Sequence, residues 1–240
     1  MNNGEDHIRL LFEYLTIILV MSVISRLFHY FLSMPKTIYF NLRCLPLNVA
    51  KRLPIFVYHN VRLGELHKGI IKINAPITSF MIKYGVGGVK GIESHKSQLW
   101  LQKGTITFKG TASFAEGCSI RNNGELVFGN NFGAGKNCFI SCSKQIVFGD
   151  DILMAWNGTV RDSDGHTVLY DNIPQESFKP VIIGDHVWLA AETHVLKGVR
   201  IGNNSIVAYR SLVNKAFDES GILIGGSPAK KIKESVNWEN

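Results

Sequence analysis

The sequence predicts an all-β solenoid in which short parallel strands coil around one core. The main observation is an unbroken six-residue register of aliphatic residues, at Ile183, Leu189, Val195, Ile201, Val207 and Val213. A helix has a period of 3.6 and a pleated strand a period of 2, so a period of six fits neither. It fits coils of three strands, each about six residues long with its turn, that share one core.

Two further patterns extend this register toward the N-terminus. Phe108, Phe128 and Phe148 lie 20 residues apart, and each starts a looser series with a period of six. These series are Phe108, Phe114 and Ile120; Phe128, Ala134 and Ile140; and Phe148, Met154 and Val160. Glycine followed by a pair of Asn or Asp residues recurs at 129–131, 149–151 and 202–204. Such residues suit corners because they tolerate positive φ.

Residues 1–54 are predicted to form a hydrophobic helical segment and a linker. The uncharged stretch from Tyr14 to Ser25 has 12 residues, whereas a membrane-spanning helix needs about 20. Three interpretations stay open: a helix packed on its own protein or in an oligomer, a helix over residues 8–33 lying on a membrane surface, and a true span. Pro35, Pro46 and Pro54 predict an irregular linker over residues 35–54.

The solenoid is expected over residues 55–217, followed by a tail over 218–240. The open ends of stacked coils expose unpaired backbone and need covers. Residues 1–54 are one candidate cover. The segment 228–236 is the other, and we expect a short helix there because it opens on Pro228.

The largest break in the register is the loop over residues 161–182. It is too long for a corner and too polar for a core, and functional residues concentrate on loops that a rigid scaffold holds. It contains His166, preceded by Asp162 and Asp164. A histidine can take a proton from an alcohol near neutral pH. Either aspartate could orient its ring, and the sequence does not choose between them.

Composition excludes several classes of protein. The formal net charge of +7 suits an anionic partner. We expect no nucleic acid, because the basic residues are dispersed and no recognition motif occurs. The four cysteines form no CxxC pair, so we expect no metal site, and the repeat places Cys118 and Cys138 at equivalent positions of adjacent coils.

The chain resembles the hexapeptide-repeat acyltransferases, and in particular the sugar O-acetyltransferases encoded in polysaccharide gene clusters. The resemblance covers roughly residues 106–234. It rests on the hexad run, the histidine-bearing loop and the tail IGGSPAKKI. It implies a left-handed parallel β-helix, a homotrimer with active sites between subunits, and direct transfer from acetyl-CoA to a sugar hydroxyl of capsule, O-antigen or exopolysaccharide.

The resemblance also implies roles for individual residues. His166 matches the general base. The positions that match the donor site are Trp188, Ala191, Tyr209, Asn214, Lys215, Lys230 and Lys233. The chain departs from the pattern at Ala190 and at Tyr209–Arg210, where smaller residues are usual. The acceptor cannot be carried over, and Trp156 and Asn157, just before the loop, are the candidates for its site.

The sequence leaves two alternative functions. A γ-type carbonic anhydrase shares the scaffold but needs three histidines converging on zinc, and His186 and His194 lack that spacing. A non-catalytic assembly protein would need no function at His166. The acyltransferase hypothesis implies a cytoplasmic protein, with residues 8–33 as a peripheral contact to the inner face of the membrane.

Overall fold

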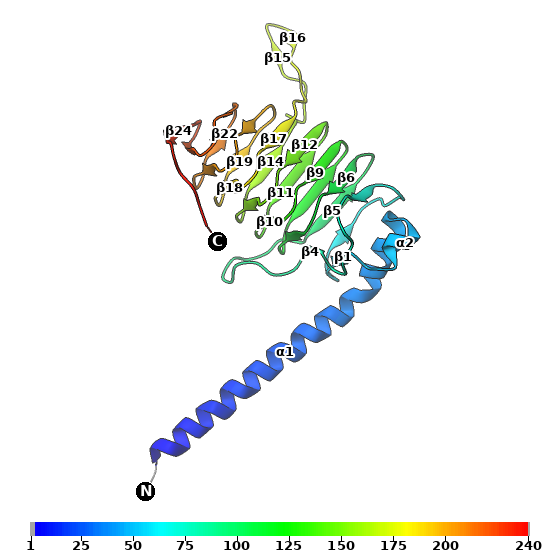
Figure 1. The fold of residues 1–240 in the computed structure, drawn as a ribbon, viewed down its shortest axis with the longest axis vertical. Coiled ribbons are helices and arrows are strands. Elements are labelled where there is room, and N and C mark those ends of the chain that lie inside the picture. Colours follow the sequence, from blue (N-terminus) through cyan, green and yellow to red (C-terminus); the bar gives the residue numbers. More distant parts are fainter. Residues whose placement is uncertain (1–2, 240) are drawn as a thin grey trace.

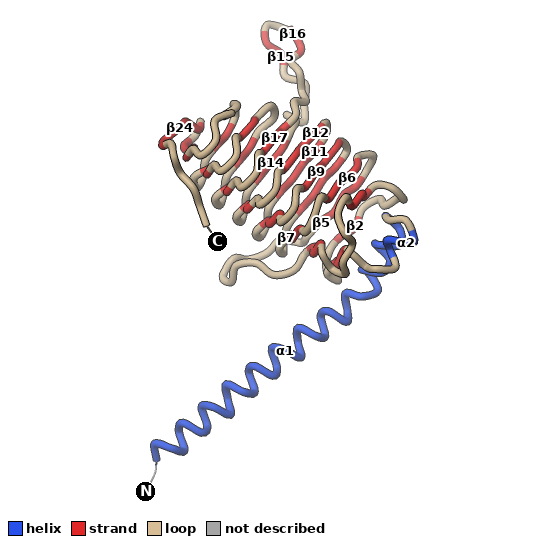
Figure 2. Tube along the Cα trace, viewed as in Figure 1, coloured by secondary structure: helices blue, strands red, loops and turns tan. Residues whose placement is uncertain are grey.

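The computed structural model describes residues 3–239. Its body is a stack of coils with three parallel sheets on its sides (Figure 1). Strands and tight turns alternate along most of the body, and the two helices of residues 3–239 lie at its N-terminal end (Figure 2). Neighbouring strands within a sheet come from successive coils. The predicted β-helix is therefore confirmed.

The strands fall into three large sheets, which we call A, B and C. Sheet A contains β1 (Ile55–Val57), β4 (Ile82–Tyr84), β7 (Ala112–Phe114), β10 (Phe132–Ala134), β13 (Leu153–Met154), β18 (Trp188–Leu189), β21 (Ile206–Val207), β23 (Leu223–Gly226) and β24 (Ala229–Lys233). Sheet B contains β2 (Arg62–Leu63), β5 (Gln98–Leu101), β8 (Ser119–Asn122), β11 (Phe139–Cys142), β14 (Thr159–Arg161), β19 (His194–Val195) and β22 (Leu212–Val213). Sheet C contains β20 (Arg200–Ile201), β17 (Val181–Ile183), β12 (Gln145–Phe148), β9 (Glu125–Phe128), β6 (Thr105–Phe108) and β3 (Ile71–Ile73).

The six-residue register forms the core as predicted. All six aliphatic residues of the register are buried, with at most 3% of any one exposed. The residue four positions after each of the first five is also buried. These residues are Val187, Thr193, Val199, Ser205 and Ser211. Cys118 and Cys138 are buried free thiols on adjacent coils. The hexad thus describes one inward side chain for each strand.

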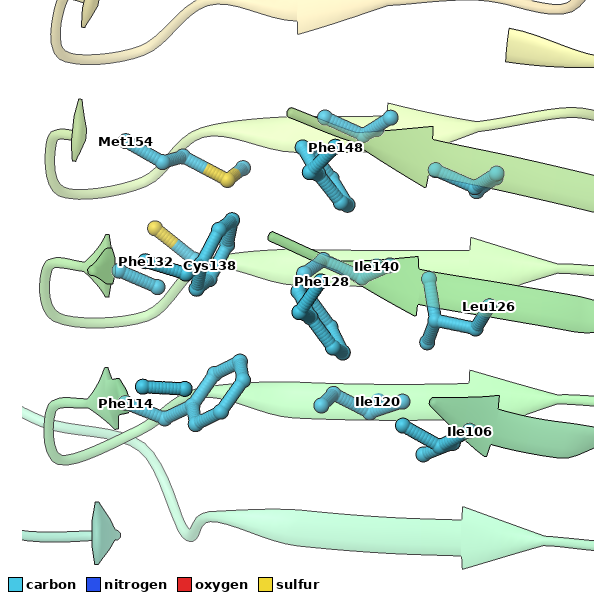
Figure 3. Packing of buried hydrophobic residues seen from close by; sticks show 14 of the residues in the cluster. Ile106, Phe114, Ile120, Leu126, Phe128, Phe132, Cys138, Ile140, Phe148 and Met154 are labelled. Carbon is cyan, nitrogen blue, oxygen red and sulfur yellow. The ribbon is translucent and has the colours of Figure 1, made fainter. Parts of the chain in front are cut away.

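Aromatic rings fill the wider coils at the N-terminal end of the core (Figure 3). Phe128 stacks on Phe108 at 5.2 Å between ring centroids and on Phe148 at 5.4 Å. Phe114 and Phe132 pack beside this stack. The 20-residue spacing in the sequence is therefore the number of residues in one coil. Equivalent rings of successive coils consequently stack on one another.

Replacing Phe128 by alanine is expected to lower the free energy of unfolding by about 3–5 kcal/mol, because the central ring of the stack is fully buried. Val127→Ala is the matched control: Val127 is the neighbour on the same strand and is only half-buried. Its loss should cost about 1 kcal/mol or less. Urea denaturation measures both, and equal losses would contradict the layered core.

The corners carry the predicted Asn and Asp residues. The N–H of Asn130 donates to Asp150 (2.7 Å), that of Asp150 to Asp185 (2.8 Å), and that of Asp185 to Asn203 (2.9 Å). The next residue at each of these corners has a φ between 54° and 57°. This ladder of side chains ties successive coils together along one edge of the body.

The linker predicted for residues 35–54 is wrong over its first half. Helix α1 (Asn3–Cys44) continues through Pro35, and a short helix α2 (Leu47–Ala50) follows. The prolines suggested a break, but this part of α1 is fixed by packing against β1. Within the described part of the chain, no helix combines the length and apolar content needed to cross a membrane.

Polar side chains of α1 cover the open N-terminal end of the β-helix. They lie four residues apart, so they share one face of the helix. Each accepts a backbone N–H from the free edge of sheet A, at 3.0–3.2 Å. The pairs are Ser33 with His59, Thr37 with Val57, and Asn41 with Ile55. The cover expected from residues 1–54 is therefore present, and it combines these polar contacts with apolar ones, since Phe40 of α1 is fully buried in the hydrophobic core.

The short C-terminal helix predicted over residues 228–236 is also wrong. Residues Ala229–Lys233 form β24, which pairs antiparallel with β23 at the last edge of sheet A. An exposed sheet edge offers unpaired N–H and C=O groups, and a returning strand satisfies them in a way that a helix cannot. Pro228 therefore starts a strand that covers the C-terminal end.

Candidate active site

The loop between β14 and β17 projects from the corner between sheets B and C (Figure 1). At its tip lies a two-stranded hairpin, β15 (Leu169–Tyr170) and β16 (Ile173–Pro174). The tip exposes apolar side chains, including Tyr170 at 65% and Ile173 at 64%. A projecting loop with an exposed apolar tip has the character of a contact to another molecule.

Asp162 anchors the base of this loop. Its side chain is fully buried. One carboxylate oxygen accepts the N–H of Ser143 (2.7 Å), and the other accepts those of Lys144 (2.7 Å) and Gln145 (2.8 Å). Three charge-assisted bonds compensate the burial of the carboxylate. The side chain of Asp162 therefore holds the loop to the preceding coil.

Asp164 makes a different contact. Its carboxylate lies 2.5 Å from the Nζ of Lys197, and both side chains are partly exposed. Lys197 also donates to the carbonyl of Glu176 on the returning arm of the loop. The two arms are thus joined above the buried anchor.

His166 lies above this base and is exposed. Its backbone carbonyl accepts a bond from the Ser177 hydroxyl (3.3 Å). Among the residues whose structure is described, its imidazole ring has no hydrogen-bond partner. Neither Asp162 nor Asp164 contacts the ring within one chain. The imidazole ring of His166 is therefore accessible to solvent, while the base of its loop is held by the contacts of Asp162 and Asp164.

The acceptor candidates and two donor-site candidates share a different corner, between sheets A and B. Trp156 and Asn157 follow β13, Ala191 follows β18, and Tyr209 follows β21. Successive turns are bonded, since the N–H of Glu192 donates to Trp156 O (2.9 Å) and that of Arg210 to Ala191 O (3.1 Å). The structure brings these residues into one column.

Glu192 is a residue in this column that the sequence did not single out. Its carboxylate accepts the Tyr209 hydroxyl (3.0 Å) and pairs with the Arg210 guanidinium (2.7 Å). The bond to Glu192 raises the pKa of Tyr209, because the carboxylate favours the protonated phenol. The large residues at 209 and 210, unusual for the resembled family, are held by a carboxylate one coil away. Only the stacking of coils could reveal this contact.

Trp188 lies half-buried on sheet A, and its ring centroid is 6.3 Å from that of Trp238. Trp238 stacks on His186 at 4.4 Å and donates its indole N–H to the His186 carbonyl. His186 is therefore partly covered by the C-terminal tail. No motif surrounds Trp238, so this contact could not be predicted from the sequence.

The remaining donor-site candidates are basic or polar residues near the C-terminal end. Asn214 and Lys215 follow β22 and are exposed. Lys230 and Lys233 are exposed on β24, and within the described chain neither forms an ion pair. Lys231 between them pairs with Glu219 and Glu234, each at 2.7 Å. The free ammonium groups fit the phosphates of a nucleotide-bearing donor.

One chain does not assemble all these residues. His166 lies at the corner between sheets B and C, whereas Ala191 and Tyr209 lie at the corner between A and B. The width of sheet B separates the two corners. In the part of the chain that the structure describes, no group of three or more His, Cys, Asp or Glu side chains could hold a metal ion.

Comparisons with known proteins agree with this architecture. The family model "Bacterial transferase hexapeptide (six repeats)" matches residues 180–215. The putative acetyltransferase YJL218W of Saccharomyces cerevisiae is 32% identical over 119 residues, which are 49% of this chain and 59% of the yeast protein. Galactoside O-acetyltransferase of Escherichia coli is 33% identical over 109 residues, 44% of this chain and 52% of that enzyme. The chain thus spans little more than half the length of either relative.

Another curated relative and one solved structure cover more of their own length. The putative lipopolysaccharide biosynthesis O-acetyl transferase WbbJ of Escherichia coli is 28% identical, and the match covers 51% of this chain and 80% of WbbJ. The crystal structure of the polySia-specific acetyltransferase NeuO has a TM-score of 0.51 at 19% identity, covering 78% of this chain and 89% of NeuO. Residues 180–215 of the chain therefore match the hexapeptide repeat, its fold is that of a left-handed β-helix, and it resembles the hexapeptide acyltransferases, sugar O-acetyltransferases among them.

Proposed function

We propose that this protein is an acetyl-CoA-dependent O-acetyltransferase that acts on a sugar hydroxyl in surface polysaccharide biosynthesis. The observation that carries the proposal is the exposed His166 ring on a long excursion of the coil that the buried Asp162 anchors. The relatives named as acetyltransferases support the reaction class. WbbJ and NeuO, named for glycan acceptors, support the choice of a glycan.

In the proposed reaction His166 acts as general base. Its unprotonated ring nitrogen accepts the proton of the sugar hydroxyl as the hydroxyl oxygen attacks the acetyl thioester. The C–S bond breaks, and the imidazolium returns the proton to the leaving sulfur. Bound acetyl-CoA would supply the acetyl group. The anchored loop base contributes by holding the backbone on either side of His166 in place while the proton moves.

The donor would lie along the C-terminal half of the body. We assign Lys230 and Lys233 to its phosphates because their ammonium groups are free and exposed. Trp188, Ala191 and Tyr209 would border its pantetheine arm. Asn214 and Lys215 would line the same groove, and Trp156 and Asn157 would face the acceptor.

We propose that the active sites lie between the subunits of a homotrimer. His166 and the column of Ala191 and Tyr209 lie at different corners of one chain, so a neighbour is needed to complete the site. The exposed apolar loop tip around Tyr170 and Ile173 supports such a contact. In a trimer, the loop of one subunit would face the column of the next.

The proposal is tested by incubating the purified protein with acetyl-CoA and measuring CoA release. Release should depend on an added glycan acceptor, and mass spectrometry should find one acetyl ester on that glycan for each CoA released. Release that is independent of every hydroxyl acceptor would contradict the O-acetyltransferase. Hydration of carbon dioxide by the same sample, with bound zinc, would favour the carbonic anhydrase instead.

We further propose a cytoplasmic protein that contacts the inner membrane face through residues 8–33. Helix α1 extends away from the body (Figure 1) and exposes Leu27 at 64%, Phe28 at 60% and Phe31 at 78%. Apolar side chains on a free helix bind the boundary of a bilayer. Attachment there would hold the enzyme near a lipid-linked acceptor.

The double variant Leu27→Asp/Phe31→Asp is expected to reduce co-sedimentation with anionic lipid vesicles by more than about tenfold, because each side chain contributes about 1.5–3 kcal/mol when buried. Val89→Asp, which changes an exposed apolar residue in the loop before β5, is the control. Unchanged sedimentation with a smaller assembly mass would show that α1 contacts another subunit and not the membrane.

A further inference from the structure

A hollow of about 460 Å³ lies on the outer face of sheet B, across β5, β8 and β11. It is separate from the residues assigned above. Its size is within the range of pockets that bind small ligands, roughly 300–1,000 Å³. Apart from the buried Ile120, the residues that line it are Gln98, Trp100, Gln102, Ser119, Arg121 and Phe139.

The hollow follows from the strand register. Gln98, Ser119 and Phe139 are aligned across the three strands. All three point outward, because the residues that follow them on their strands are buried. The small serine between a long amide and an aromatic ring leaves the depression. Phe139 is 36% exposed at its edge.

Trp100 forms one wall as an oriented, exposed ring. It is 44% exposed, and its indole N–H donates to Gln98 Oε1 (2.9 Å). Gly64 lies against the indole: a Cβ there would be 2.7 Å from Trp100 Cε3. Glycine therefore permits the close approach, and the ring is fixed by a neighbour on one side and by a hydrogen bond at its edge. An exposed aromatic face held in this way is a platform for an apolar ligand surface.

The charge of this face is one-sided. No strand residue of sheet B is acidic, whereas Arg62, Arg121 and Arg161 are on its strands. Arg121 lines the hollow and is exposed. Among the described residues its guanidinium has no ion-pair partner. A free guanidinium beside planar amides favours a ligand that has a carboxylate.

The hollow is connected with the loop of His166. Trp100, Arg121, Ser141 and Arg161 are aligned across β5, β8, β11 and β14. With adjacent strands about 4.8 Å apart, this row is about 14 Å long. Its end is beside the loop, because a Cβ on Gly165 would be 3.3 Å from Arg161 Nη2, and Gly165 precedes His166.

We propose that this hollow binds a stretch of acidic glycan, with sugar rings stacked on Trp100 and Phe139 and a carboxylate at Arg121. The apolar C–H face of a pyranose fits an aromatic ring, and its hydroxyls fit the amides of Gln98 and Gln102. The row from Trp100 to Arg161 then leads the chain toward His166. The inference rests on the proposed function, and it makes the acceptor a polymer bearing carboxylates.

The test is calorimetric binding of two oligomers of equal length to the full chain without acetyl-CoA: a sialic acid oligomer, which is acidic, and a dextran oligomer, which is neutral. The wild type should bind the acidic oligomer. Trp100→Ala and Arg121→Gln should each weaken this binding by about tenfold or more. The matched controls, Ile182→Ala on the outer face of sheet C and Lys109→Gln at an exposed turn, should bind like the wild type.

Gly64→Ala is a further variant, and it retains Trp100, Arg121 and the other side chains assigned to the ligand. It should weaken binding because the added methyl displaces the indole, while the unfolding transition remains cooperative. His166→Ala should bind as the wild type does, so loss of acetyl transfer and loss of glycan binding are separate results. Binding that survives without any transfer activity would overturn the proposed function and leave the glycan site standing.

Other results would overturn the glycan site. These are no binding of the acidic oligomer by the wild type, equal binding of the neutral oligomer, or unchanged affinity in Trp100→Ala and Arg121→Gln. Light scattering supplies the last check. A change in assembly mass in Trp100→Ala would show that this face joins copies of the chain.

Discussion

Replacing His166 by alanine is expected to lower the rate constant for acetyl transfer by about 10²–10⁴, the contribution of a positioned general base. The Michaelis constants for donor and acceptor should change little, because the imidazole acts on the proton in the transition state. The fold should be unaffected, since the side chain is exposed and its ring has no partner in the described chain.

His95→Ala is the matched control, because His95 is equally exposed in the loop between β4 and β5. That variant should transfer acetyl groups at the wild-type rate. The free energy of unfolding of both variants, measured by thermal denaturation, should lie within about 0.5 kcal/mol of the wild-type value. Wild-type turnover by His166→Ala would exclude the general base and favour a non-catalytic scaffold or another residue.

The register and the corners could be predicted from sequence because their causes are local. An inward side chain recurs every six residues, so the period alone predicts that Val195 and Val207 are buried in the core. The Asn and Asp residues at the corners are equally visible, since positive φ restricts the choice of residue. The loop that contains His166 could also be predicted, because the six-residue register is interrupted there.

The ends could not be predicted because their partners are distant in the chain. Pro35 predicts a break when it is considered alone. Asn41 bonds to Ile55, and this contact between helix and sheet edge fixes α1 there. In the same way Pro228 suits a helix start, but the free edge of β23 pairs with the tail as a strand.

The different contacts of Asp162 and Asp164 also could not be predicted from the sequence. Asp162 and Asp164 are both close enough to His166 to suggest an orienting contact. The difference between them is burial. Asp162 is turned into the body against backbone N–H groups of the coil below, and Asp164 is turned outward to Lys197. A loop sequence does not record which way a side chain points.

Replacing Asp162 by alanine is therefore expected to reduce the free energy of unfolding by about 3–5 kcal/mol. The change leaves the N–H groups of Ser143, Lys144 and Gln145 without their buried acceptor. Asp162→Asn should restore little of this stability. Its amide has only one acceptor oxygen, and its NH2 group would face backbone N–H groups, which are also donors. Urea denaturation measures the loss.

Asp164→Ala is the control for this prediction, since it removes one partly exposed ion pair with Lys197. Its cost should be about 1 kcal/mol or less. If Asp162→Ala were as stable as the wild type yet lost acetyl transfer, the carboxylate would act on His166 directly. A fall in stability with turnover lost in proportion to the unfolded fraction would instead establish Asp162 as the anchor that holds the histidine in place.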